Sequence, residues 1–92
     1  MHTYFVYLLT NLHRTTLYCG MTNNLQRRLF EHKSGLSIFT KRYNVKYLVW
    51  FQEFHSAIEA IVAEKRIKNM GRAEKNILIE QSNPSWEFLN NE

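Results

Sequence analysis

The sequence contains no aspartate, and this absence excludes any metal site built from several aspartate side chains. It also contains a single cysteine, Cys19, so no disulfide can form within the chain. The fold must therefore be stabilised by packing. A reducing, cytoplasmic compartment is the expected setting.

Long apolar runs are absent too. The longest nearly apolar run, Phe5 to Leu9, is far too short to cross a bilayer, so we expect no membrane partner. It has neither a basic leader nor a small-residue cleavage site, so we expect no signal peptide. No repeat or linker interrupts the 92 residues. We predict one domain over 1–92, with a core at about 4–82 and a C-terminal tail at 83–92.

Positive charge is concentrated in the first half of the chain. Residues 1–50 hold seven Lys or Arg and one Glu, for a net charge of +6, whereas residues 51–92 have a net charge of −2. A basic half facing a polyanion is one explanation. Chance and solubility explain the charge equally well.

The hydrophobic pattern predicts three strands and three helices in the order β-β-α-β-α-α. Residues 4–10 are apolar on both faces, which is typical of a central strand with a layer on each side. We therefore predict an α+β domain, with a three-stranded antiparallel sheet, its first strand central, flanked by helices. The other elements are expected at 17–20 (strand), about 23–33 (helix capped by Thr22 or Asn23), 45–53 (strand), 56–70 (helix opened by a capping box) and 72–81 (helix), with a polar loop at 34–43.

Two tyrosines are expected to project from one face of the first hairpin. If the turn is centred between Leu12 and His13, Tyr7 lies directly opposite Tyr18. The pair can be either a chemical site or an aromatic contact that only packs. Gly20 follows, and the helix after it would present free backbone N–H groups to an anion.

That helix places Arg28 and His32 four residues apart, on one face. A guanidinium held near the core boundary can grip a phosphate through two parallel hydrogen bonds. An arginine that simply extends along the surface is the alternative.

The helix at 56–70 places Glu64 in an apolar stripe that includes Ala60 and Ile67. A carboxylate there is costly unless it is paired or binds a metal. The alternatives are a salt bridge to an arginine at the edge of the core and a ligand to Mg²⁺, with water and substrate phosphate completing the shell.

Five short motifs, in order, resemble the GIY-YIG nuclease superfamily. Eleven residues separate Tyr7 from Tyr18, a spacing typical of that family. The last motif resembles the ending of its small, stand-alone bacterial members. Phe5 and Cys19 replace the family's usual glycine and isoleucine. The motifs are Phe5-Val6-Tyr7, Tyr18-Cys19-Gly20, the segment from Gly20 to His32 with Thr22 and Arg28 at family positions, Ala60 to Lys68 around Glu64, and Asn83-Pro-Ser-Trp86-Glu-Phe-Leu89.

The resemblance implies metal-assisted hydrolysis of a phosphodiester bond. Glu64 would hold one Mg²⁺ or Mn²⁺ ion, Arg28 would neutralise transition-state charge, and Tyr7 would activate the attacking water. A phenol acts as a base at neutral pH only if nearby cations or hydrogen bonds tune its pKa. The other implied active-site residues are Tyr18 and His32, which share the proton transfer, and Asn83. The implied nucleic-acid contacts are Arg27, Lys41, Arg42, Lys46 and Lys68.

Three functions follow from this reading. The first is an endonuclease acting on DNA or RNA, with structured or damaged DNA favoured because the domain has no separate recognition module; DNA repair is one such setting. The second is a nucleic-acid-binding module of the same fold that cuts weakly or not at all. The third is a protein-interaction adaptor using Trp50, Trp86 and the tail. A protein partner or a homodimer is compatible with the first, but no residue pattern indicates either.

Overall fold

The computed structural model describes residues 2–36 and 41–90. Part of the polar loop expected at 34–43, and the last two residues of the expected tail, therefore lie outside the described residues. The elements are β1 (Tyr4–Thr10), β2 (Leu17–Thr22), α1 (Leu25–Lys33), β3 (Tyr47–Phe54), α3 (Ala57–Lys68) and α4 (Arg72–Ser82).

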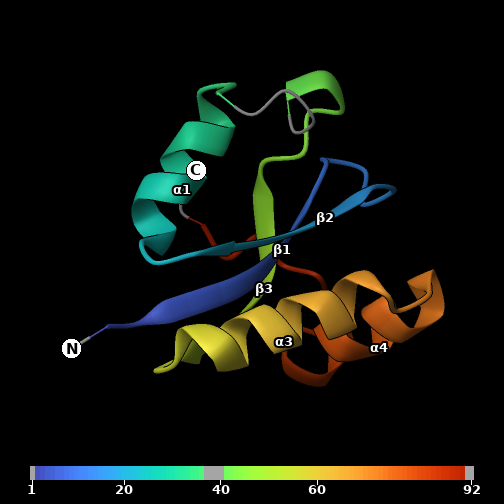
Figure 1. Ribbon diagram of the computed structural model, residues 1–92. Coiled ribbons are helices and arrows are strands. Elements are labelled where there is room, and N and C mark those ends of the chain that lie inside the picture. The colour runs from blue at the N-terminus through green and yellow to red at the C-terminus, as the bar shows by residue number, and fades with distance from the viewer. Residues whose placement is uncertain (1, 37–40, 91–92) are drawn as a thin grey trace.

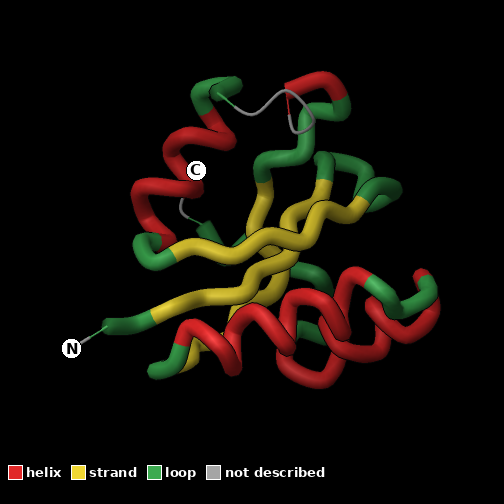
Figure 2. Tube along the Cα trace, in the orientation of Figure 1, coloured by secondary structure: helices red, strands yellow, loops and turns green. Residues whose placement is uncertain are grey.

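The three strands form one antiparallel sheet in the order β2-β1-β3. The predicted α+β class, element order and central first strand are confirmed. Figure 1 shows α1 on one face of the sheet and α3 with α4 on the other, and Figure 2 shows the same three layers by element type. No helix among the described residues has the length and apolar character needed to cross a membrane.

The central strand divides the core in two. Val6 and Leu8 point toward α3 and α4, where they pack with Ala60 and Ile67. Tyr7 and Leu9 point toward α1 and join the second cluster. All four strand side chains are at most 1% exposed, so β1 is covered on both faces, as its sequence pattern predicts.

The predicted register of the first hairpin is wrong by two residues. Tyr7 pairs with Gly20, and Tyr18 pairs with Leu9. The turn is displaced because the Asn11 side chain organises it: Asn11 Oδ1 accepts hydrogen bonds from the backbone N–H groups of Thr15 at 2.8 Å and Thr16 at 3.0 Å. Since a shift of two keeps every side chain on its face, the tyrosines still share one face, now diagonally.

The helix boundaries differ slightly from those predicted. Asn24, not Thr22 or Asn23, caps α1, and its side chain accepts a hydrogen bond from the N–H of Arg27 at 3.0 Å. Thr22 lies two residues earlier, where its hydroxyl accepts a hydrogen bond from the Asn24 N–H at 3.1 Å. The helix α3 ends at Lys68, and β3 starts at Tyr47 rather than residue 45.

The C-terminal tail covers the outer edge of β3. Leu89 N–H donates to Leu48 O at 2.7 Å, and the Asn90 amide bonds to Leu48 N–H and to Lys46 O. Pairing of this kind protects an edge strand from association with other chains. The Phe88 ring stacks on Tyr47 at 4.1 Å between centroids.

Asn83 is buried at the start of this tail and holds it to the sheet. Its Nδ2 donates to Val49 O and Glu87 O, and its Oδ1 accepts from Glu87 N–H, each at 2.9 Å. The whole amide is therefore used in backbone contacts. Trp50 is likewise buried in the core, and Trp86 donates through its indole N–H to Glu80, so these groups serve the fold.

We expect Asn83→Ala to lower the free energy of unfolding by about 2–3 kcal/mol, because it leaves buried backbone groups without partners. Urea unfolding followed by circular dichroism measures this loss. The control is Gln81→Ala, an exposed position in the last turn of α4. Equal stability of the two variants would contradict the role assigned to Asn83.

Candidate functional site

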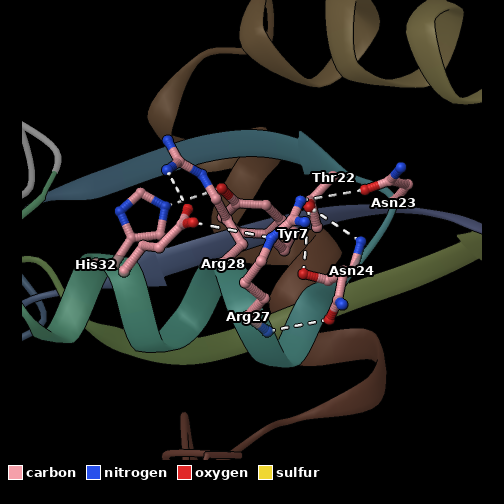
Figure 3. A network of polar contacts seen from close by, with 8 residues as sticks. Tyr7, Thr22, Asn23, Asn24, Arg27, Arg28 and His32 are labelled. Carbon is pink, nitrogen blue, oxygen red and sulfur yellow. Dashed lines mark hydrogen bonds and ion pairs between the residues drawn. The ribbon is translucent and has the colours of Figure 1, made fainter.

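The α1 face of the sheet brings two tyrosines and a histidine together. The Tyr7 hydroxyl lies 2.9 Å from His32 Nε2, and both residues are buried. The Tyr18 ring lies 5.3 Å from the His32 ring and 6.4 Å from the Tyr7 ring, measured between centroids. Figure 3 shows Tyr7 next to the Arg28 and His32 side chains, which project from α1.

Gly20 makes room for this arrangement. It is the cross-strand partner of Tyr7, and a Cβ atom built on it would lie 2.4 Å from the Tyr7 hydroxyl oxygen. Any side chain at this position would force the phenol to move. The glycine of the second motif is therefore required by the close approach of Tyr7.

Arg28 links the two phenols. Its guanidinium interacts by hydrogen bonding with Tyr7 and Tyr18, and it donates to Glu31 Oε1 at 2.9 Å. The ion pair with Glu31 is the main reason that the pKa of Arg28 lies above its ordinary value. The side chain is about one-third exposed, so a ligand can reach it from solvent.

Burial shifts the proton affinities of the buried pair. It raises the pKa of Tyr7 to about 12, although the hydrogen bond from Arg28 acts in the opposite direction. It lowers the pKa of His32 to about 4, and the positive charge of Arg28 adds to this effect. At neutral pH the site therefore contains a protonated phenol and a neutral imidazole. The nearby cation does not bring the pKa of Tyr7 into the neutral range.

Glu64 comes from the other side of the sheet. The helix α3 packs through Ala60, Ala63 and Ile67 on the face opposite Tyr7, and Glu64 lies at the edge of this buried stripe. Ile61 is an apolar residue of the same helix, but it is 44% exposed and so does not belong to the buried stripe. The carboxylate pairs with Lys68 at 3.3 Å, rather than with an arginine.

Glu64 lies close enough to Cys19 of β2 for its charge to affect that thiol. Burial, and then the Glu64 carboxylate, raise the pKa of Cys19 to about 11. The strand β2 is an edge strand, and α1 and α3 lie on opposite faces of the sheet. A ligand that runs along the outer edge of β2 is the one that could meet both Arg28 and Glu64.

Among the described residues, one carboxylate of the proposed site, that of Glu64, could bind a divalent ion. In residues 2–36 and 41–90, no group of three or more His, Cys, Asp or Glu side chains is arranged to hold a metal. Mg²⁺ is nevertheless often held by one or two carboxylates with water and substrate phosphate. Glu64 is compatible with that mode once its ion pair with Lys68 opens.

The predicted nucleic-acid contacts do not form one cluster. Arg27 is exposed on α1 beside the site, and Lys68 lies on α3 with Glu64. Lys46 lies over the Tyr47 ring at the start of β3. Lys41 and Arg42 are exposed and directly follow the gap in the described residues.

Glu31 is a further charged residue beside the site, and no family position in the motifs marks it. It lies on the same face as Arg28 and is the single acidic residue among the first fifty. Its spacing, three residues after Arg28 and four after Arg27, indicates ion pairs with both arginines, because residues so spaced are neighbours on a helix.

The lowered pKa of His32 makes the stability of the protein depend on pH. Between pH 6.5 and about 4 the unfolded chain binds a proton at His32 and the folded chain does not, so stability falls as the pH is lowered through this window. The loss is at most about 3 kcal/mol. Urea unfolding at pH 7 and pH 4.5 measures it, and His32→Gln should reduce it.

The control for this comparison is His55→Gln, since His55 is exposed and precedes α3. It should keep the full pH dependence of the wild type. If His32→Gln and His55→Gln show the same dependence, His32 is not the group that destabilises the fold in acid.

Comparison with known proteins agrees with this architecture. The chain is 36% identical over 78 residues to a UPF0213 protein from Vibrio campbellii, covering 84% of this chain and 74% of the relative. It is 41% identical over 69 residues to a UPF0213 protein from Syntrophus aciditrophicus, covering 73% and 79%.

A solved structure shows the same fold. The solution NMR structure of a UPF0213 protein from Bacillus halodurans matches with a TM-score of 0.60 and 29% identity, covering 92% of this chain and 90% of that one. Residues 3–77 match the GIY-YIG catalytic domain, which includes both tyrosines, Arg28, His32 and Glu64. The chain therefore belongs to the GIY-YIG family, and it resembles that family's small UPF0213 members over most of its length.

Proposed function

We propose that this protein is a metal-dependent endonuclease that hydrolyses phosphodiester bonds, with DNA as its main substrate. The observation that carries the proposal is the cluster of Tyr7, His32 and Arg28 on the α1 face, next to an edge strand. GIY-YIG domains generally belong to endonucleases, so the fold supports the same reaction.

Arg28 is the proposed phosphate-binding group. A guanidinium offers five donors in a planar fork, which matches the non-bridging oxygens of a phosphodiester. It stays charged at any physiological pH, so it can stabilise the extra negative charge of the transition state. Its hydrogen bonding with Tyr7 and Tyr18 would place the phosphate over both phenols.

Tyr7 and His32 are the proposed proton relay. A phenol whose pKa is about 12 is a poor general base by itself. However, Tyr7 can accept a proton from the attacking water while its own proton passes to His32 Nε2, 2.9 Å away. The neutral imidazole can accept it in the tautomer that carries the hydrogen on Nδ1.

Substrate binding would strengthen this relay. The positive charge of Arg28 is one cause of the low pKa of His32. A phosphodiester paired with Arg28 offsets that charge, so the pKa of His32 should rise toward its ordinary value in the complex. The base therefore becomes stronger when the substrate is in place.

Glu64 is the proposed ligand of a single Mg²⁺ or Mn²⁺ ion. When bound, the metal would supply Lewis-acid stabilisation of phosphate oxygens. The substrate would have to lie along the β2 edge to contact both Glu64 and Arg28. Lys68, which pairs with Glu64 at 3.3 Å, could then be available to contact the nucleic-acid backbone.

The nuclease proposal predicts cleavage of plasmid, branched DNA or RNA in Mg²⁺ or Mn²⁺, and no cleavage in chelator. Tyr7→Phe should lower kcat by about 10²- to 10⁴-fold because it removes the relay hydroxyl. Arg28→Ala should lower it by about 10²- to 10³-fold because it removes the charge opposite the transition state. Glu64→Ala should abolish cleavage in both Mg²⁺ and Mn²⁺ because it removes the metal ligand.

Lys65→Ala is the control, because Lys65 is exposed on α3 next to Glu64 and belongs to no part of the proposed site. It should cut at nearly the wild-type rate. Binding without cleavage by the wild type would favour the binding-module function. Full activity of Glu64→Ala would show that the metal ligand has been misassigned.

A further inference from the structure

Glu31 presents the carboxylate that faces Arg28 in the unliganded protein. Its Oε1 accepts a hydrogen bond from a terminal guanidinium nitrogen of Arg28 at 2.9 Å. Its Oε2 lies 3.8 Å from Arg27 Nε. One carboxylate thus lies between two guanidinium groups on the exposed side of α1.

A carboxylate and a phosphodiester bind the same N–H donors of an arginine side chain. Both offer two oxygens that accept parallel N–H donors, so they compete for the same fork of a guanidinium. The Arg28 and Glu31 side chains are 30% and 29% exposed, so water and a ligand can enter the pair. An ion pair at such a site is weak enough to exchange.

We infer that the Glu31 carboxylate pairs with Arg28 in the free protein and that a phosphodiester replaces this carboxylate when nucleic acid binds. The inference rests on the proposed function, because it takes Arg28 as the phosphate-binding group. In the free protein the Arg28 guanidinium bonds to Glu31 and also interacts with Tyr7 and Tyr18. After the exchange, Arg27 offers the displaced carboxylate a second partner.

The exchange adds a cost to the binding of a phosphate inside the site. A polyanion that touches only the exposed lysines and Arg27 leaves the Arg28–Glu31 pair closed. A phosphate that enters the site opens the pair and gains the aligned guanidinium. Glu31 would therefore weaken the binding of phosphates that reach Tyr7 and leave peripheral binding unchanged.

The competing explanation is a helix-surface ion pair with no role in binding. Pairs of this spacing stabilise a helix slightly and are common. Removing such a pair would change nucleic-acid affinity only through the general loss of one negative charge. A matched loss of charge elsewhere therefore separates the two explanations.

The test compares Glu31→Gln with Glu59→Gln, which removes the same charge from an exposed position on the opposite face. Fluorescence anisotropy of a short labelled DNA duplex, in chelator, measures affinity without cleavage. We expect Glu31→Gln to bind about two- to fivefold more tightly than Glu59→Gln, as the worth of a part-exposed ion pair implies.

The same pair of substitutions in an Arg28→Ala background isolates the exchange. With Arg28 absent, Glu31→Gln and Glu59→Gln should have equal effects. Equal affinities in the wild-type background would overturn the inference, as would a gain that survives without Arg28. Circular dichroism melting confirms that each variant is folded.

The two proposals fail in different ways in this design. Tight binding by Glu31→Gln with no cleavage by the wild type contradicts the endonuclease and leaves the exchange intact. Cleavage by the wild type with equal affinities of the two glutamine variants contradicts the exchange and leaves the endonuclease intact. Absence of DNA binding in every variant overturns both.

Discussion

Burial of β1 on both faces, from Val6 to Thr10, is the constraint on which the rest of the structure depends. A central strand with apolar side chains on both sides needs a layer above and a layer below. Here α1 supplies one layer, and α3 with α4 supplies the other. Tyr7 is 1% exposed because of this, so its hydroxyl needs a partner inside the protein. His32 is that partner, and the hydrogen bond between them is also the centre of the proposed chemistry.

The sequence predicts the elements well because each has a local cause. Runs of aromatic and aliphatic residues mark the strands, Ser56 opens α3, and Gly35 follows α1 with a φ of +77°. The GIY-YIG motifs also point to Tyr7, Arg28 and His32, which the structure brings together.

Features that depend on distant or side-chain-specific contacts could not be predicted in the same way. The hairpin register follows from bonds of the Asn11 side chain, which the hydrophobic pattern does not report. The role of Asn83 depends on Val49, thirty-four residues away in sequence. The direction of the Tyr7 pKa shift depends on burial, and burial outweighs the neighbouring cation.

Glu64 is the part of the site that the fold constrains least. The helix that carries it is placed by packing against Val6, Leu8 and Cys19, on the face away from Tyr7. A sheet separates the two halves of the proposed site, and they can act together only across the β2 edge. This arrangement would make the nucleic acid itself the element that joins the general-base side to the metal side. It also explains how a domain with one candidate carboxylate ligand could still use a divalent ion, since the substrate would complete the shell.

The most direct test of this account is a crystal structure of Tyr7→Phe with a short DNA duplex and Mn²⁺, using anomalous scattering to locate the metal. The account predicts a phosphate hydrogen-bonded to Arg28 at the β2 edge, with the Mn²⁺ peak between that phosphate and Glu64. A phosphate bound elsewhere, or a metal peak remote from Glu64, would contradict it.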